Sequence, residues 1–206
     1  MLSIQANKAS KRFQYEWIFK NLSLDLKPGE SMAITGGNGS GKSTLIKCLT
    51  GAIPLSEGEI TYKQTAEILD SAQWYQHLSI AAPYLELPEE FTLVEVIDFH
   101  FKFKKSINGT TPIQLSEILY LENHLQKPVS QFSSGMKQRL KLGLALFSDV
   151  SVIFLDEPTS NLDRKGVEWY SKLIEEYQQE RILIIGSNEP REYTFCGQKV
   201  AMEDFK

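Results

Sequence analysis

The amino-acid sequence predicts an α/β fold with a mostly parallel central sheet. Near-continuous apolar runs at residues 31–35, 150–155 and 181–185 are typical of strands that are buried on both faces. Helical patterns lie between these runs, and strands that alternate with helices favour a parallel sheet. The chain has 206 residues, which is enough for one domain with a substantial core. We therefore predict a single domain over residues 1–206.

Short strands open the chain. Residues 2–7 and 22–27 have the clustered or alternating apolar pattern of strands. A turn is expected at Lys27-Pro28-Gly29-Glu30, where proline and glycine occupy positions that turns favour. The buried strand at 31–35 follows this turn directly.

A glycine-rich loop and a helix come after that strand. The helix is expected to end near Thr50, because Gly51 is a common stop signal at helix ends. A turn at 56–60 then leads into another short strand. Residues 76–82 predict a further strand, which Pro83 closes.

Residues 84–147 have a mostly helical pattern and are expected to form a helical subdomain. The breaks in this pattern are Pro88, Asn108-Gly109 and Pro128. The apolar side chains spaced for one helix face are Val94, Ile97 and Phe101. In the run at 99–105 aromatic and basic residues alternate, which permits stacking on single-stranded nucleic acid. A helix with a packed face and a solvated lysine face is the favoured interpretation.

The last third of the chain returns to alternating strands and helices. Residues 167–179 predict an amphipathic helix between the strands at 150–155 and 181–185. Residues 198–203 predict a final strand at the edge of the sheet.

Composition and charge restrict the classes of binding partner and the location that we expect for this protein. The net charge of −4 gives no reason to expect binding to nucleic acid or to an anionic membrane surface. The first residues are too short and too polar a stretch for a signal peptide. No apolar run approaches the roughly 20 residues of a membrane span. We therefore expect a cytoplasmic protein and no nucleic-acid partner.

The loop after the first buried strand has the complete G-x-x-x-x-G-K-[ST] pattern. It consists of Gly36, Gly37, Asn38, Gly39, Ser40, Gly41, Lys42, Ser43 and Thr44. Its glycines let successive backbone N–H groups turn toward a polyphosphate, and the following helix adds its positive dipole end. Lys42 is expected to reach the β- and γ-phosphates, and the Ser43 hydroxyl to ligate Mg²⁺. The pattern predicts a nucleotide site.

A second motif follows the strand at 150–155. Asp156 and Glu157 stand at its carboxyl end, where open α/β sheets bind ligands. Asp156 suits a contact to Mg²⁺, either directly or through a ligand of the ion. Glu157 suits polarising a water for attack on a γ-phosphate. The alternative is that both merely cap the strand against solvent. The phosphate loop upstream favours the functional interpretation.

A third motif precedes an apolar helical run. Ser133, Ser134 and Gly135 stand where one of the serines would cap the helix that follows. The same arrangement is an anion site. Its own sequence does not say which phosphate it would hold.

Together these residues give the chain its resemblance to ABC-type ATPases, the ATP-binding subunits or domains of ATP-binding-cassette systems. The resemblance covers nearly the whole chain in the family order. Phe13 matches the aromatic that stacks on adenine, and residues 36–44 match Walker A. Residues 132–136 match the signature. Asp156 and Glu157 match Walker B and the catalytic glutamate, and residues 160–163, with Asp163, match the D-loop. The signature departs from the usual LSGGQ in having Ser134 for the first glycine and Met136 for the glutamine.

The resemblance implies a P-loop NTPase with a mostly parallel central sheet, an N-terminal antiparallel β portion and an inserted helical subdomain. It implies ATP and Mg²⁺ as cofactors. It also implies a second ATP-binding cassette, identical or different, paired head to tail so that the signature residues Ser133, Ser134 and Gly135 act in trans. The other implied partner is an integral membrane permease. The chain would then lie peripherally on the cytoplasmic face of the inner or plasma membrane, with a docking groove supplied by residues 84–130.

Two positions depart from the family pattern. The glutamine at the entry to the helical subdomain falls on Tyr84 or Pro83 when counted back from residues 91–95, and Tyr84 is our choice. Asn188 stands where the family has its switch histidine, and asparagine carries no charge and shuttles no proton. Losing a charge-assisted contact near the transferred phosphoryl would cost about 1.5–3 kcal/mol, or roughly 10–150-fold in rate. We therefore expect slow but genuine ATP hydrolysis.

Three functions are compatible with these residues. The leading one is an ATPase subunit that energises an ABC transporter. The second is a clamp or switch that binds ATP, dimerises and hardly hydrolyses, which Tyr84 and Asn188 favour and Glu157 opposes. The third is a soluble ABC protein acting on DNA or ribosomes, for which the acidic balance is unsuited.

Overall fold

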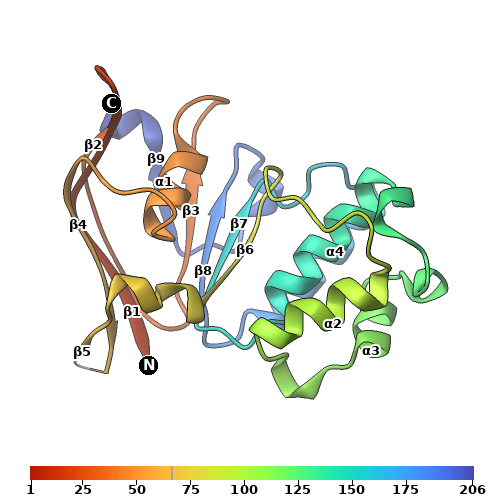
Figure 1. Ribbon diagram of the computed structural model, residues 1–206. Coiled ribbons are helices and arrows are strands. Elements are labelled where there is room, and N and C mark those ends of the chain that lie inside the picture. Colours follow the sequence, from red (N-terminus) through yellow and green to blue (C-terminus); the bar gives the residue numbers. More distant parts are fainter. Residues whose placement is uncertain (66) are drawn as a thin grey trace.

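The computed structural model describes residues 1–65 and 67–206, and its centre is a five-stranded sheet (Figure 1). The strand order is β6-β7-β8-β3-β9, and all neighbours in it are parallel. The strands are β3 Ser31–Thr35, β6 Leu78–Ala81, β7 Val152–Asp156, β8 Ile182–Gly186 and β9 Gln198–Ala201. The predicted parallel sheet is therefore confirmed, and its carboxyl ends all face one edge.

A second, antiparallel sheet has the order β2-β1-β4-β5. Its strands are β1 Leu2–Phe13, β2 Glu16–Leu26, β4 Glu57–Gln64 and β5 Glu67–Ile68. The expected strands at 2–7 and 22–27 are too short, since β1 and β2 form one long hairpin. The register shifts between Ala6 and Ala9, and charged side chains interrupt the apolar pattern of the outer half. Such a bulged strand lacks the regular apolar alternation on which the expectation depended.

Five α-helices complete the described part of the chain, and most of their starts follow local capping. They are α1 Lys42–Leu49, α2 Leu93–Phe103, α3 Pro112–Ile118, α4 Ser134–Leu146 and α5 Arg164–Tyr177. Thr92 and Thr111 form capping boxes at α2 and α3. Helix α5 begins three residues before the expected 167, because Asp163 accepts the N–H of Gly166 at 2.7 Å. No helix in the described part of the chain is long and apolar enough to cross a bilayer.

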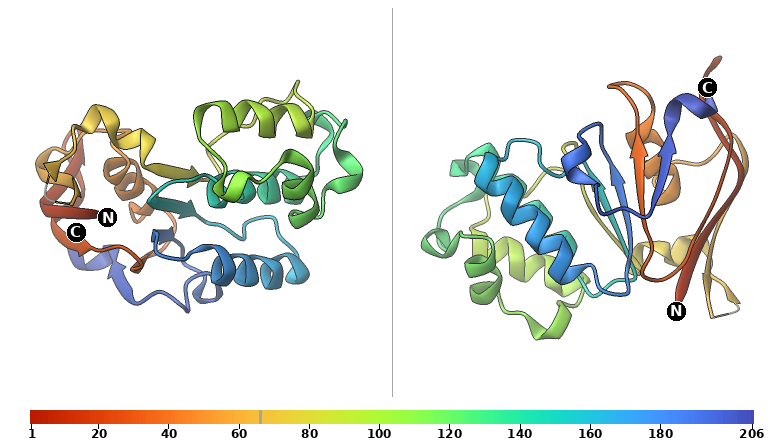
Figure 2. Two further views of the ribbon diagram at one scale, coloured as in Figure 1. Left: turned by 90° about the horizontal axis from the view of Figure 1, so that it is seen from below. Right: turned by 180° about the vertical axis from the view of Figure 1, so that it is seen from behind.

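The parallel sheet separates two hydrophobic clusters. Val152 and Phe154 of β7 face the cluster that lies toward the antiparallel sheet and α1. Ile153 and Leu155 face the cluster that includes residues of α2, α3, α4 and α5. This alternation is the period of two of a strand that is buried on both faces. Figure 1 shows α1 between the two sheets and α2 to α4 gathered on the other side, and Figure 2 shows α5 beside them.

Other expectations need correction. A 3₁₀ turn at Ser71–Gln76, capped by Asp70, delays the strand expected at 76–82, so that β6 begins at Leu78. The edge strand expected at 198–203 ends at Ala201, where a 3₁₀ turn at Met202–Phe205 begins.

The aromatic residues of α2 are also only partly on the expected packed face. Ile97 is buried and Phe101 packs against the core, but Phe99 and Phe103 are exposed. The rings of Phe99 and Phe103 make an edge contact at 5.1 Å, and the rings of Phe91 and Phe99 make another at 5.7 Å. Contacts among these rings replace burial in the core.

Candidate nucleotide site

The candidate residues gather at the carboxyl edge of the parallel sheet. Strand β3 ends in the phosphate loop, β7 ends in Asp156, and β8 lies between them. The register pairs Gly186 of β8 with Asp156 on one side and with Ile34 on the other. Because all strands point the same way, three segments that are far apart in sequence meet at this edge.

Two glycines of the loop are required by its geometry. Gly36 has φ 143° and Gly41 has φ 109°, in the region that favours glycine. A Cβ at Gly36 would come within 2.6 Å of the Ser40 hydroxyl oxygen. A Cβ at Gly41 would come within 2.5 Å of the Ile18 side chain. The loop therefore keeps its shape only with glycine at both positions.

The loop and Glu157 share one small cavity of about 210 Å³. Its lining residues are Ile18, Asn38, Gly39, Ser40, Gly41, Lys42, Ser43, Thr44 and Glu157. Two motifs predicted separately therefore meet in space. Ile18, which lies in β2, is a wall of this cavity that the sequence analysis missed. No local pattern marks it, since the contact arises only from the packing of the hairpin on the loop.

Lys42 is only 5% exposed, and its ammonium group stays inside the loop. The Nζ atom donates to the carbonyl oxygen of Gly36 at 2.8 Å and to that of Gly37 at 3.1 Å. These neutral partners are weaker acceptors than a phosphate oxygen, because a charged phosphate adds Coulomb attraction to the hydrogen bond. The amino end of α1 lies beside the same group.

Asp156 is 1% exposed, and neither of its carboxylate oxygens receives a hydrogen bond of full geometry from the described residues. Burial raises the pKa of Asp156, the nearby Ser43 hydroxyl opposes this rise, and the charge of Glu157 adds to it. Lys42 and Lys47 also lower the pKa. A buried carboxylate without partners is costly unless a ligand supplies them. A divalent cation beside Asp156 and Ser43 would satisfy both oxygens.

The described residues contain no cluster of three or more histidine, cysteine, aspartate or glutamate side chains suited to a metal ion. A cation at Asp156 would therefore need its other ligands from hydroxyl, water and phosphate oxygens. Mg²⁺ is commonly held in this way, by one or two carboxylates and the phosphates of its substrate.

Glu157 adopts a left-handed backbone conformation with φ 47°. The backbone N–H of Glu157 donates to the backbone oxygen of Gly186 at 2.8 Å, and the backbone oxygen of Glu157 accepts from the N–H of Ser160 at 3.1 Å. Several turn residues elsewhere in the chain also have positive φ, and at Glu157 these two backbone bonds hold the conformation in place. The turn directs Glu157 into the cavity of the phosphate loop.

Tyr84 lies just beyond the end of β6, beside the same edge. The Nζ atom of Lys47 lies 4.1 Å from the centre of its ring. Burial raises the pKa of Tyr84, and the charge of Asp156 raises it further, so the phenol stays protonated. The geometry therefore brings Tyr84 near the Asp156 carboxylate.

Phe13 and Asn188 do not line the cavity among the residues described. Phe13 ends β1 and is 49% exposed, with the Nζ atom of Lys11 at 4.9 Å from its ring centre. Asn188 is exposed and follows Ser187 after β8.

The signature residues are not among the cavity lining either. Ser133 caps α4 by accepting the N–H of Met136 at 3.2 Å, and α4 then begins at Ser134. A Cβ at Gly135 would come within 3.1 Å of the Asn161 oxygen. The Gln138 amide donates to the Pro158 oxygen at 2.7 Å, and Asp163 caps α5. The signature helix is thus fixed to the turn that follows Glu157.

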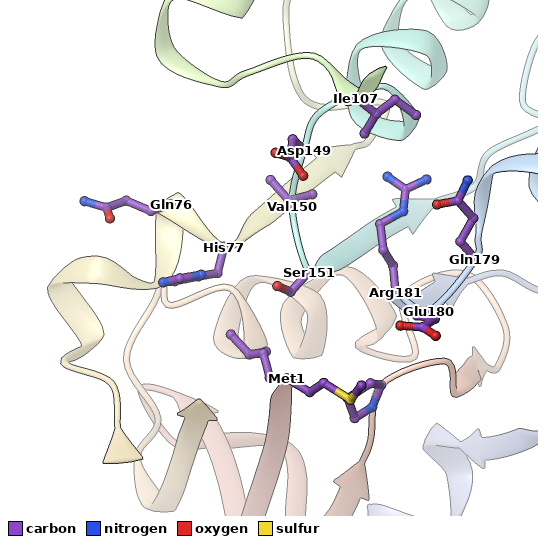
Figure 3. A pocket seen from close by; sticks show the side chains of 12 residues that line it. Met1, Gln76, His77, Ile107, Asp149, Val150, Ser151, Gln179, Glu180 and Arg181 are labelled. Atoms are coloured by element: carbon purple, nitrogen blue, oxygen red, sulfur yellow. The ribbon is translucent and has the colours of Figure 1, made fainter. Parts of the chain in front are cut away.

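Another cavity, of about 400 Å³, lies at the opposite edge of the sheet (Figure 3). Residues of its wall precede β7 and β8, among them Asp149, Ser151 and Arg181. Arg181 is 9% exposed and donates to four backbone oxygens. These are the oxygens of Leu146 at 2.7 Å, Ser148 at 3.3 Å, Gln178 at 3.3 Å, and Tyr177. Ligands of open α/β sheets bind at the carboxyl edge, so this amino edge is not the candidate site.

Comparison with known proteins identifies the family. The family model described as ABC transporter matches residues 19–160. The chain belongs to the ABC transporter family of ATP-binding proteins. SrtF, a lantibiotic transport ATP-binding protein of Streptococcus pyogenes, is 31% identical to this ABC protein over 192 residues, covering 91% of this chain and 80% of SrtF.

Two further relatives agree with this assignment. The ABC transporter ATP-binding protein YcbN of Bacillus subtilis is 29% identical over 177 residues, covering 86% of this ABC protein and 58% of YcbN. The chain thus spans 58% of one relative and 80% of the other. The structure of an ABC transporter ATP-binding protein from Pyrococcus furiosus matches with a TM-score of 0.82 over 99% of both chains, at 17% identity, which shows the shared fold. The predicted ABC-type ATPase class and its P-loop fold are confirmed.

Proposed function

We propose that this chain is an ATP-binding subunit that hydrolyses ATP to energise an ABC transporter. Residues 1–206 would act as a single ABC domain, with residues 84–147 as its helical subdomain. The observation that carries this proposal is the cavity shared by the phosphate loop and Glu157. A phosphate-binding loop alone binds nucleotide, whereas a carboxylate facing the same cavity adds a group that can act on water.

ATP would bind through the loop and the amino end of α1. The N–H groups of residues 38–44 and the positive end of the helix dipole would receive the phosphates. Lys42 would exchange its bonds with the Gly36 and Gly37 oxygens for stronger ones with β- and γ-phosphate oxygens. The exposed ring of Phe13 would stack on the adenine.

Ser43 and Asp156 would hold Mg²⁺, because the two buried oxygens of Asp156 lack partners and Ser43 lies beside them. When bound, Mg²⁺ neutralises charge on the phosphate oxygens during transfer. Lys42 would contribute to the same neutralisation from within the loop.

Glu157 would orient and polarise the attacking water. Tyr84 and Asn188 would stand near the transferred phosphoryl in place of the family's glutamine and histidine. Asn188 offers a hydrogen bond without charge, which supports slow turnover rather than its absence.

The membrane partner and the second cassette are part of the proposal. The signature residues Ser133, Ser134 and Gly135 are not among the residues that line this chain's own phosphate cavity, which supports a role in trans in a homodimer or heterodimer. Tyr84, Leu85, Leu87 and Phe91 would belong to the groove that receives an integral membrane permease. The chain would then act at the cytoplasmic face of the inner or plasma membrane.

A second candidate function is a clamp or switch that binds ATP, dimerises and hardly hydrolyses it. Two observations favour it, namely the uncharged Asn188 and the phenol of Tyr84. Glu157 in the phosphate cavity opposes it.

The deciding experiment measures ATP turnover with Mg²⁺ by the wild type and by Glu157→Gln, with the oligomeric state followed in parallel. Turnover by the wild type and an ATP-bound dimer without turnover in the variant are expected. Tight ATP binding without turnover in either protein would favour the switch. Normal turnover by a monomeric Glu157→Gln would overturn the assignment of Glu157.

A further inference from the structure

A buried carboxylate joins two of the segments that end at the nucleotide edge. Glu192 is 2% exposed and lies in the 3₁₀ turn Pro190–Glu192. Its oxygen Oε1 accepts from the N–H of Thr159 at 2.7 Å and from the Thr159 hydroxyl. Its oxygen Oε2 accepts from the Ser187 hydroxyl. Glu192 is absent from the salt bridges of the described residues, so neutral donors stabilise this carboxylate.

The hydrogen-bond partners of Glu192 lie close in sequence to two of the candidate site residues. Thr159 lies two residues after Glu157, and Ser187 immediately precedes Asn188. The Ser187 hydroxyl also accepts from the N–H of Glu189 at 2.9 Å, so it shapes the turn that carries Asn188. One carboxylate therefore bonds both the turn that follows Glu157 and the turn that carries Asn188.

Two further hydrogen bonds connect the segment that contains Ser187 and Glu192 to α5 and to β3. The Tyr170 hydroxyl of α5 donates to the backbone oxygen of Glu192 at 3.0 Å. The N–H of Ser187 donates to the Ile34 oxygen at 3.0 Å, two residues before the phosphate loop. The assembly is thus anchored in α5 and in β3 and does not rest on a mobile surface turn.

We propose that Glu192 is a positioning residue for ATP hydrolysis, which couples the turn after Glu157 to the segment that carries Asn188. This inference rests on the proposed function of Glu157 and Asn188. Glu157 sits in a left-handed conformation that its surroundings must hold, and Glu192 supplies part of that support through Thr159. A misplacement of about 1 Å in such a site can cost roughly 100-fold in rate. Glu192 is not among the residues that line the cavity of the phosphate loop, so its loss should affect turnover more than ATP binding.

The first variant is Glu192→Gln, which keeps the size of the side chain but leaves one acceptor oxygen for three donors. We expect turnover by the variant to fall about 10- to 100-fold, while its dissociation constant for ATP changes less than about 3-fold. A purely structural role would lower thermal stability and ATP affinity together with turnover. The exposed carboxylate of Glu175 on α5 gives the matched control, and Glu175→Gln should leave turnover unchanged.

Two milder variants keep the test decisive if Glu192→Gln does not fold. Thr159→Val and Ser187→Ala each remove one hydroxyl donor from the carboxylate. Each should slow turnover with ATP affinity retained, and the double variant should slow it by less than the product of the two single effects. Such non-additivity is the signature of residues that act through one shared group.

The outcomes separate this inference from the proposed function. If the wild type hydrolyses ATP and Glu192→Gln folds and matches its turnover, the positioning role is wrong while the ATPase function stands. Independent, multiplicative effects of Thr159→Val and Ser187→Ala would also overturn the coupling. If the wild type shows no turnover, the hydrolytic function fails, and the positioning role fails with it.

Discussion

At the carboxyl edge of the parallel sheet, buried polar atoms of Ser40, Asp156 and Ser160 have no partner among the described residues. At the amino edge, the buried guanidinium of Arg181 donates to four backbone oxygens. Burying a polar group without a partner costs about 1–3 kcal/mol. The carboxyl edge therefore has buried polar atoms that a bound ligand can satisfy, whereas the buried guanidinium at the amino edge already has protein partners.

The same sheet thus has one end for function and one for stability. Arg181 bonds the last carbonyl groups of α4 and α5, where the negative ends of two helix dipoles converge. Burial lowers its pKa to about 10, and the charge of Asp149 opposes this, so it stays charged at neutral pH. Substitutions at the carboxyl edge should therefore weaken ATP binding without lowering the stability of the fold. Substitutions at the amino edge should lower the stability of the fold without weakening ATP binding.

The largest effect is expected from Lys42→Ala. Its ammonium group bonds only two loop carbonyls among the described residues, so folding should change little. ATP affinity should fall by at least roughly 150-fold, because two charge-assisted bonds to phosphate are lost. Isothermal calorimetry measures the loss. Lys63→Ala, whose amine bonds Gln5 in the antiparallel sheet, is the control and should bind ATP normally. Tight binding by Lys42→Ala would contradict the site.

Arg181→Met tests the amino edge. It removes the donors to four backbone oxygens, and we expect the free energy of unfolding to fall by about 2–4 kcal/mol. Urea denaturation measures this change, and the ATP affinity of the folded variant should match that of the wild type. Arg164→Met is the control, because Arg164 is exposed on α5 and its pair with Glu168 should contribute under about 0.5 kcal/mol. Equal stability of Arg181→Met and Arg164→Met would remove the contrast between the edges.

Residues in a fixed motif could be predicted from the sequence, whereas residues whose role arises from packing could not. The phosphate loop and the Asp156-Glu157 pair were found because their chemistry requires particular residue types at fixed spacing. Arg181, Ile18 and Glu192 carry no such pattern, since each acquires its role only when distant segments meet. The parallel strands were predicted from their apolar runs, but the outer half of the β1–β2 hairpin was not, because bulges and charged residues disrupt its period.

Asn188→His sharpens the comparison at the functional edge. A histidine would restore a group able to carry charge near the γ-phosphate, and turnover should rise by roughly 10-fold or more. Steady-state phosphate release measures the rise. Because the charge of an imidazole changes near neutral pH, the turnover of the histidine variant should depend on pH. Asn188→Gln is the control, since it changes length without adding charge. A rise in both variants, or in neither, would mean that the missing charge does not limit the rate.

The most gradual effect should appear at the amino edge as a dependence of stability on pH. A ring nitrogen of His100 lies 2.8 Å from the Ser148 hydroxyl, and the backbone oxygen of Ser148 accepts from Arg181. Burial, reinforced by the charge of Lys104, lowers the pKa of His100 to about 4. Between about pH 6.5 and 4 the unfolded chain therefore takes up a proton that the folded chain refuses, and stability falls as the pH falls.

The expected loss through His100 is at most about 3 kcal/mol between pH 7 and pH 4. Urea denaturation of the wild type and of His100→Gln at a series of pH values isolates this contribution. The difference in stability between the two proteins should stay constant above pH 7 and shrink or reverse below pH 6, because glutamine has no proton to gain. A parallel decline of both proteins from pH 7 to pH 4 would show that His100 does not set the acid sensitivity of this edge.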